Sequence, residues 1–190
     1  MAAKSNLTNM VLCLTLVCFF CASVLGGVYA LTSEPIADAA RKALVESLGK
    51  VLPSEGTIGE AQTAELDGVK YQYYKQSLND TTVVAYAVKS VTIGFSGPIT
   101  VMVGVLPDGT VYNTSVLEHS ETPGLGAKCE NDEKFLSQFR MLKPGKKLLV
   151  KKDGGDLDAI TASTITSRAY SKAVANAIAL VKSMEGKSNE

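Results

Sequence analysis

Residues 99–118 read ITVMVGVLPDGTVYNTSVLE, and this stretch is the strongest indication of the fold class. The first eight residues form an apolar, largely β-branched run that is typical of a β-strand. The sequence PDGT at residues 107–110 is a strong turn signal, because proline presets its backbone angle and glycine accepts a positive φ. Residues 111–118 then return as a second strand. The stretch therefore predicts a β-hairpin and antiparallel pairing.

Two more strands are expected upstream, where residues 69–75 and 83–88 are short β-branched and aromatic runs. The Asn79-Asp80 pair is expected to form the turn between them. Downstream, residues 131–139 are a short helix candidate, and residues 147–152 are expected to form a further strand that the sequence DGGD ends.

The C-terminal part is expected to be a helix. Apolar residues, many of them alanine, recur between residues 169 and 181 at a spacing that places them on one narrow face. Strands in the middle of the chain and helices around them indicate an α+β fold, with a twisted, mainly antiparallel sheet flanked by helices.

The N-terminal part carries an uncharged apolar block, residues 11–31. About 20 apolar residues in a helix rise roughly 30 Å, which is enough to cross the hydrocarbon core of a membrane. We therefore expect one N-terminal transmembrane helix that the mature protein keeps. A cleavable signal peptide is the alternative, because VYA at residues 28–30 resembles a cleavage site. The apolar run is longer than the roughly 7–15 residues of a signal-peptide core, however, and Lys4 is the one charged residue before it.

A second helix is expected after the apolar block. Ser33, Glu34 and Pro35 supply a hydroxyl N-cap, an acid and an early proline, which are typical of a helix start. Apolar residues recur at helical spacing from there until Pro53, so we expect an amphipathic helix that packs on the main domain. A stalk that faces a partner protein is the alternative.

These features divide the chain into three parts. Residues 1–32 would form an N-terminal cytoplasmic stub and the transmembrane helix, residues 33–62 the amphipathic helix and a linker, and residues 63–190 an extracytoplasmic domain. Lys4 and the amino terminus precede the apolar block, whereas the charges that follow it nearly cancel. The positive-inside rule therefore favours a cytoplasmic N-terminus.

The composition excludes several functions. Lys and Arg number 19, and Asp and Glu also number 19, so no net field attracts nucleic acid. Three of the four cysteines lie in the apolar block and Cys129 is alone outside it, which excludes a disulfide within the domain and an iron–sulfur framework. His119 is the single histidine, so neither a metal site nor a catalytic triad is expected.

The most informative motif lies at residues 158–168, DAITASTITSR, directly before the C-terminal helix. Hydroxyl residues crowd a predicted helix N-terminus, where unpaired N–H groups and the helix dipole favour an anion. Such a segment suits a phosphate group. The alternative is a plain Ser/Thr-rich helix cap.

This motif resembles the flavinylation motif of the FMN-binding domain family, written Asp-x-x-Ser/Thr-Gly-Ala-Thr/Ser. Asp158 matches the aspartate, Thr161 the first hydroxyl residue, and Thr164 the last one, which in that family carries FMN through a phosphoester bond. Ala162 and Ser163 stand where glycine and alanine are usual. Glycine there would suit a positive φ or a close approach, and Ser163 adds a competing acceptor hydroxyl.

Two other segments carry the same resemblance. Residues 119–126, HSETPGLG, are similar to the family's His-x-Glu-Thr-Pro-Gly-Leu-Gly segment, and residues 94–98, GFSGP, are similar to its Gly-Tyr-x-Gly-Pro turn. The resemblance implies that the isoalloxazine ring of FMN lies against the first of these segments, with Leu125 on the ring face. Thr122 and the backbone at Gly124 and Gly126 would hydrogen-bond to the ring. The alternative is a tight turn with a capping glutamate. The residues implied in cofactor binding are Thr164, Glu121, Thr122, Gly124, Leu125, Gly126, Thr161, Ser163 and Thr166.

Within this family the chain resembles the G subunits of Rnf complexes, membrane ferredoxin:NAD oxidoreductases that couple electron transfer to ion translocation. The resemblance implies an electron carrier with covalent FMN in the cytoplasmic membrane, its domain on the extracytoplasmic side, which is not a complete enzyme alone. The implied partners are other membrane subunits of the complex and a flavin transferase, which would recognise Asp158. The alternatives are the C subunit of the Na⁺-translocating NADH:quinone oxidoreductase, and an anchored structural or sensory module without covalent flavin.

Overall fold

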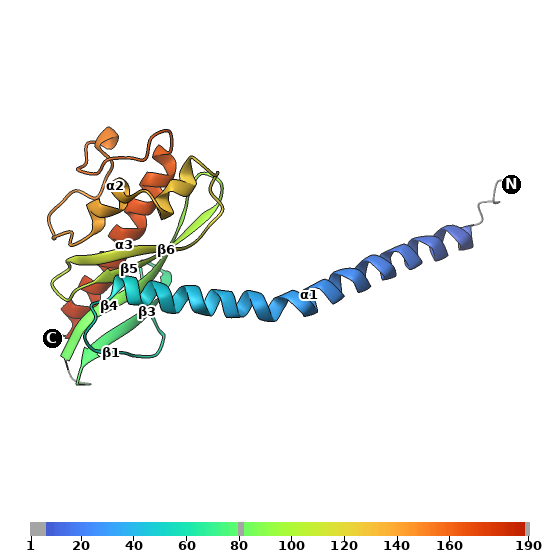
Figure 1. Cartoon of the computed structure of the whole chain (residues 1–190), viewed down its shortest axis with the longest axis horizontal. Coiled ribbons are helices and arrows are strands. Elements are labelled where there is room, and N and C mark those ends of the chain that lie inside the picture. Colours follow the sequence, from blue (N-terminus) through green and yellow to red (C-terminus); the bar gives the residue numbers. More distant parts are fainter. Residues whose placement is uncertain (1–6, 80–81, 189–190) are drawn as a thin grey trace. The chain divides into compact units, whose positions relative to one another are not determined.

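The structure is a computed structural model that describes residues 7–79 and 82–188. The chain divides into two compact units, Met1–Ala43 and Leu44–Glu190. Its helices and strands, in chain order, are α1 (Leu7–Val51), β1 (Thr57–Ile58), β2 (Gln62–Leu66), β3 (Val69–Leu78), β4 (Thr82–Ile93), β5 (Pro98–Val105), β6 (Val111–His119), the 3₁₀ helix η1 (Gly126–Glu130), α2 (Glu133–Leu136), the 3₁₀ helices η2 (Ser137–Phe139) and η3 (Lys151–Asp153), and α3 (Thr164–Ser188) (Figure 1).

Helix α1 is continuous through Pro35, so the expectation that a separate helix begins at Ser33 is wrong. Thr32, next to the expected N-cap Ser33, donates its hydroxyl hydrogen bond to Val28 O at 2.8 Å, as a residue in a helix interior does. Proline inside a helix removes one backbone hydrogen bond and destabilises the helix by about 3 kcal/mol. Only the turn around Pro35 loses a hydrogen bond, and α1 continues on both sides of it. The expected boundary between residues 32 and 33 therefore falls inside one helix.

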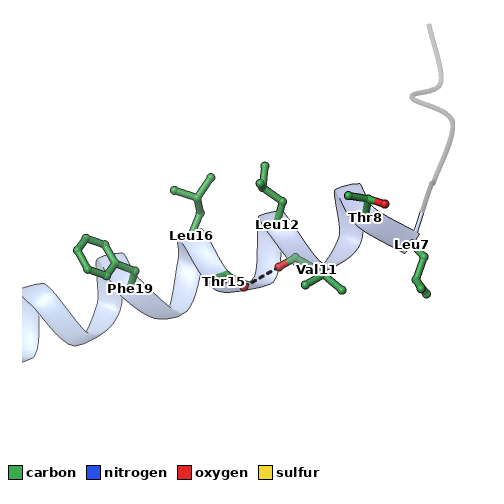
Figure 2. A pocket seen from close by; sticks show the side chains of 7 residues that line it. All are labelled: Leu7, Thr8, Val11, Leu12, Thr15, Leu16 and Phe19. Atoms are coloured by element: carbon green, nitrogen blue, oxygen red, sulfur yellow. Dashed lines mark hydrogen bonds between the residues drawn. The ribbon is translucent and has the colours of Figure 1, made fainter.

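By length and composition, α1 could cross a membrane, and none of its most apolar window is buried. Besides Thr32, Thr15 and Ser23 each donate a hydroxyl hydrogen bond of 2.8 Å to the carbonyl four residues earlier. These polar side chains are therefore satisfied without water, as a lipid environment requires. An open apolar hollow beside residues 7–19 is lined by this one helix (Figure 2), so it is a helix flank and not an enclosed site.

The sheet of the second unit has the order β1-β3-β4-β5-β6, and β2 pairs with another part of β3. Every strand pair is antiparallel, which confirms the expected sheet. The predicted hairpin is β5–β6, and its turn is held by Asp108, whose carboxylate accepts from the backbone N–H and the hydroxyl of Thr110, each at 2.8 Å. Of the expected Asn79-Asp80 turn, Asn79 has φ +54° and Asp80 lies outside the described residues.

Both faces of the sheet are covered, which explains why β5 is buried at seven of its eight positions. Val101 and Val103 point into the core shared with α3, whereas Met102 packs with Leu48 and Val51 of the last turns of α1. The expectation that the amphipathic stretch packs on the domain is thus confirmed for its end, around Leu48 and Val51.

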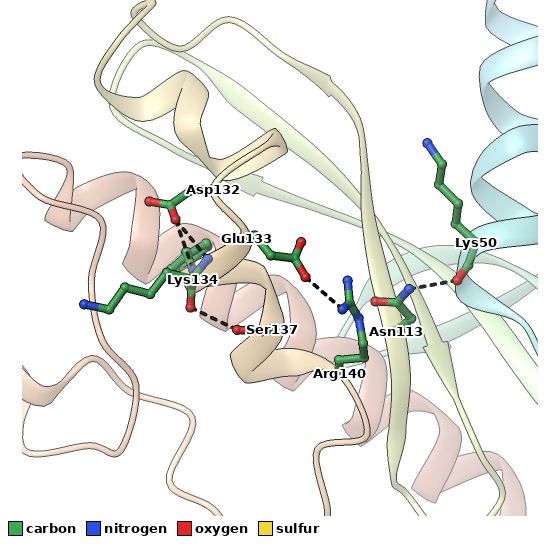
Figure 3. A network of polar contacts seen from close by, with 8 residues as sticks. Lys50, Asn113, Asp132, Glu133, Lys134, Ser137 and Arg140 are labelled. Carbon is green, nitrogen blue, oxygen red and sulfur yellow. Dashed lines mark hydrogen bonds and ion pairs between the residues drawn. The ribbon is translucent and has the colours of Figure 1, made fainter.

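The end of α1 is also joined to β6 by a hydrogen bond. Asn113 Nδ2 donates to Lys50 O at 2.9 Å, next to the ion pair of Arg140 with Glu133 at 2.8 Å (Figure 3). Asparagine thereby satisfies one of the carbonyls that a helix C-terminus leaves unpaired.

The segments after β6 depart in part from expectation. The short helix expected at residues 131–139 is present as α2 and η2, and Asp132 caps it by accepting from the backbone of Lys134 and Phe135 (Figure 3). The strand expected at residues 147–152 is wrong. Its hydrogen bonds close a local loop: Lys151 N donates to Leu157 O at 2.7 Å, and Leu157 N donates to Leu149 O at 3.1 Å. The segment reads KLLVKK, so Val150 is its single β-branched residue, and Val150 bridges Leu157 of the same loop.

Candidate functional site

A cavity of about 330 Å³ forms where the two motif segments meet, a volume typical of small-molecule sites. Its walls come from the turn between β4 and β5, the segment after β6, and the first turn of α3. The residues that line it are Phe95, Glu121, Thr122, Leu125, Gly126, Ala162, Ser163, Thr164, Ile165 and Thr166.

Most residues expected to bind the cofactor line this cavity, and two do not. Gly124 forms the turn next to it with φ +77°. Thr161 lines a separate small hollow together with Asp158. Phe95 and Ile165 were missed by the sequence reasoning. The GFSGP segment, which resembles a family turn, could have indicated Phe95. Nothing in the sequence indicated Ile165, because it is an isolated apolar residue in the first turn of a helix.

The loop before α3 is held in a left-handed turn. Ala162 has φ +61°, which confirms the expectation that this position suits a residue tolerant of positive φ. Ser163 N donates to Ile160 O at 3.0 Å, and the hydroxyl of Ser167 both donates to Ser163 O and accepts from Ile160 N, each at 2.9 Å. Ser167 therefore braces the loop from inside and does not face the cavity.

The two neighbouring hydroxyls differ in exposure. The side chain of Ser163 is buried, with 7% exposed, and its Oγ has no hydrogen-bond partner among the described residues. Thr164 is partly exposed at the first position of α3, a helix of 25 residues. A buried hydroxyl without a partner costs about 1–3 kcal/mol, so Ser163 Oγ is suited to a polar ligand group in the cavity.

Glu121 is a buried carboxylate at the centre of the site, with 5% of the residue exposed. Its Oε1 accepts from Phe95 N at 2.7 Å and Ser96 N at 3.3 Å, and its Oε2 accepts from the hydroxyl of Thr166 at 3.0 Å. Its backbone N–H donates to His119 Nδ1 at 3.2 Å. His119 Nε2 in turn lies 3.3 Å from a carboxylate oxygen of Glu130.

The first part of the motif faces away from the cavity. Gln138 clamps Asp158 through both backbone groups: Asp158 N donates to Gln138 Oε1 at 2.6 Å, and Gln138 Nε2 donates to Asp158 O at 3.2 Å. The Asp158 carboxylate pairs with Lys151 at 2.8 Å, which lowers the pKa of this exposed carboxyl. Asp158 and Thr161 therefore present one surface, and Thr164 presents another.

The one cysteine outside α1 is not a reactive group. Cys129 is fully buried, and burial, with smaller effects of Glu121 and Glu130, raises its pKa to about 12. Its thiol is protonated near neutral pH and packs as a small apolar side chain. No cluster of His, Cys, Asp or Glu suited to a metal ion occurs in residues 7–79 or 82–188.

Comparison with known proteins supplies the family. Residues 94–179 match the FMN-binding domain family. The chain is 29% identical over 190 residues to the G subunit of the ion-translocating oxidoreductase complex of Methanosarcina acetivorans, covering 98% of this chain and 100% of that one. Among solved structures, the C subunit of a Na⁺-translocating NADH-quinone reductase from Parabacteroides distasonis is 20% identical with a TM-score of 0.47, over 78% of this chain and 90% of that one. A similarity of that strength carries no argument about function.

A bacterial relative is decisive. The G subunit of the proton-translocating ferredoxin:NAD(+) oxidoreductase complex of Clostridium ljungdahlii is 33% identical over 175 residues, covering 91% of this chain and 90% of that one. The resemblance read from the motifs is confirmed by this match and by the family match. This chain therefore belongs to the family of G subunits of ion-translocating oxidoreductase complexes.

Proposed function

We propose that this chain is a membrane-anchored electron carrier of an Rnf-type complex, with FMN joined covalently to Thr164. One observation carries the proposal. Thr164, at the start of α3, lines the same cavity as Thr122 and Leu125, although these residues are far apart in the sequence. FMN supplies the electron-transfer chemistry when bound, and the protein sets its position and environment.

The difference in exposure supports Thr164 as the acceptor. A flavin transferase must reach the hydroxyl that it modifies, and Thr164 is partly exposed whereas Ser163 is buried.

The residues present fit a phosphate group at this position. The first turn of α3 offers backbone N–H groups and the positive end of the helix dipole. The unpartnered hydroxyl of Ser163 would donate to a phosphate oxygen, because it has no other acceptor among the described residues. The hydroxyl of Thr166 is already committed to Glu121, so we assign it no direct role toward the phosphate.

The outer part of the cavity fits a flat apolar ring. Phe95, Leu125 and Ile165 come from three different elements, and 69%, 44% and 46% of them, respectively, are exposed. A ring placed among them would remove apolar surface from water, which favours binding. Thr122, whose hydroxyl lies 3.4 Å from that of Ser96, would supply a polar contact at the ring edge.

We further propose that α1 crosses the cytoplasmic membrane once, with the domain on the extracytoplasmic side. The apolar length of α1 and the charge of Lys4 before it support this orientation. The partners would be the other membrane subunits of the complex and a flavin transferase that reads the exposed Asp158 and Thr161 surface. The Clostridium relative is named for electron transfer between ferredoxin and NAD(+), and we propose the same reaction class here.

Covalent attachment is tested by two neighbouring substitutions in chain co-expressed with a flavin transferase. Thr164→Val keeps the β-branched shape but removes the ester oxygen, so flavin fluorescence on a denaturing gel should vanish. Ser163→Ala should keep it. In the parent, the tryptic peptide of residues 153–168 should gain the mass of FMN minus water. Loss in Ser163→Ala with retention in Thr164→Val would make Ser163 the acceptor.

A further inference from the structure

We propose that Glu121 is a positioning residue that holds the two walls of the cavity at a fixed spacing and acts on the flavin only through them. This inference rests on the proposed function, because the cavity is the one assigned to FMN. The resemblance to the FMN-binding domain family implies only that Glu121 belongs to the cofactor-binding segment, and the hydrogen bonds of Glu121 specify its role there.

The carboxylate of Glu121 joins two segments that are distant in the sequence. Its Oε1 holds the backbone of Phe95 and Ser96 in the turn between β4 and β5. Its Oε2 holds the hydroxyl of Thr166 in the first turn of α3, two residues after Thr164. One buried side chain therefore fixes the apolar wall at Phe95 relative to the attachment point at Thr164.

Two glycines make room for this carboxylate. A Cβ added at Gly94 would overlap Glu121 Oε1, and a Cβ at Gly126 would overlap Glu121 Oε2. Neither glycine has a φ in the left-handed region, so the requirement at both positions is space and not backbone conformation. The space that the Glu121 carboxylate needs thus explains one glycine in each of the two family segments.

The three hydrogen bonds also explain how an acid can be buried here. An ionised carboxylate removed from water is costly unless hydrogen-bond donors replace the water. Phe95 N, Ser96 N and Thr166 Oγ1 supply three donors, and no ion pair to Glu121 occurs within the described parts of the chain. Both oxygens are therefore engaged by the protein itself.

The first test measures the brace, meaning the hydrogen bonds of Glu121 to Phe95, Ser96 and Thr166, in the full-length chain in detergent without flavin. Glu121→Ala should speed amide exchange of Phe95 and Ser96, because their acceptor is lost. Glu121→Gln should preserve slow exchange: its carbonyl can accept from the same two N–H groups, and its NH₂ can donate to the hydroxyl of Thr166. Glu118→Ala, an exposed acid on β6, is the control and should change nothing. Unchanged exchange in Glu121→Ala would overturn the brace.

The second test measures the consequence for the flavin, in chain loaded by a flavin transferase. Glu121→Ala should raise flavin fluorescence severalfold and shift the midpoint potential, because the ring loses its fixed walls. Glu121→Gln should keep both near the parent values. Thr166→Val removes only the hydrogen bond between Glu121 and α3, so it should give a fluorescence between those of the parent and Glu121→Ala. This variant decides the test if Glu121→Ala fails to fold. A potential shift in Glu121→Gln equal to that in Glu121→Ala would show that the charge acts on the flavin directly and would overturn the proposal. Absence of covalent flavin from the parent would instead overturn the proposed function, and the exchange test would stand.

Discussion

Ala162 is in the left-handed region of backbone space, two residues before the candidate attachment hydroxyl, with φ +61°. The Cβ of an L-residue in this conformation crowds the following carbonyl oxygen and costs roughly 1–2 kcal/mol. The chain therefore carries local backbone strain at a position where the family motif has glycine. The turn persists because Ser163 and Ser167 hold the backbone on its C-terminal side.

Replacing this residue should measure the strain. Ala162→Gly should raise the free energy of unfolding by about 1 kcal/mol, because glycine adopts positive φ without a Cβ clash. Gly154→Ala is the control in the opposite direction. Gly154 has φ +75° and space for a Cβ, so this variant should lose about 1 kcal/mol of unfolding free energy from backbone strain alone. Urea unfolding of the full chain in detergent, followed by circular dichroism, measures both. No gain in Ala162→Gly would mean that the loop relaxes at no cost.

A second prediction at this scale concerns the flavin ring. Leu125→Ala should shift the flavin spectrum or midpoint potential and leave the covalent bond intact, because it removes apolar contact but no attachment group. Leu149 is the matched control, since both leucines are 44% exposed and Leu149 does not line the cavity. Absorbance spectra and redox titration of loaded protein give the answer. An unchanged spectrum and potential in Leu125→Ala would place the ring elsewhere on the domain.

At the scale of elements, the last turns of α1 and strand β5 approach each other through a glycine. A Cβ on Gly104 would overlap the carbonyl oxygen of Val51. This close approach lets Leu48 and Val51 pack against Met102 on the sheet face opposite α3. A single small residue therefore decides whether the helix end can lie on the strand.

Two alanine substitutions near this contact should have opposite effects on the free energy of unfolding. Gly104→Ala should lower the free energy of unfolding by about 1–3 kcal/mol, because the added methyl group meets rigid backbone. Gly49→Ala, on α1 with no atom within 4 Å of the added Cβ, should raise it by roughly 0.5–1 kcal/mol through helix propensity. Denaturant unfolding of both variants compares them directly. If Gly104→Ala were neutral, α1 would not lie against β5 in solution.

At the scale of the whole molecule, one helix connects the apolar N-terminal segment to the sheet. Helix α1 has no break at residues 28–30, where the sequence resembles a cleavage site, nor at Pro35. The helix belongs to both compact units, since the first ends at Ala43 and the second begins at Leu44.

We therefore expect the purified protein to keep its N-terminal helix. Intact-mass measurement of the chain, expressed without a fused tag and without a flavin transferase, should give the mass of the full sequence, apart from loss of the initiator methionine. Ala30→Leu removes the small residue that a signal peptidase would need, and it should change the mass by the substitution alone. A mature N-terminus at Leu31 in the parent, restored to full length in Ala30→Leu, would show a cleaved signal peptide.

Features that depend on neighbouring residues could be predicted from the amino-acid order alone. The hairpin of β5 and β6 follows from two β-branched runs around PDGT, and α3 follows from apolar spacing after a hydroxyl-rich start. A positive φ at position 162 was one of the two explanations that the sequence offered for the glycine of the motif, and it is the one confirmed. Each of these rests on local sterics or periodicity, which a short stretch of chain encodes.

How these parts meet depends on tertiary packing. The sequence predicts a strand at residues 147–152, but their backbone hydrogen bonds close a local loop in which Val150 bridges Leu157. The motif around Thr164 divides between two hollows, and Gln138, outside the motif, holds the backbone of Asp158 at the second one. Glu121 reaches the turn of Phe95 and the hydroxyl of Thr166 because three separate elements converge there. The partners of a buried polar group are set by which segments pack together, and residue order within a motif does not specify that packing.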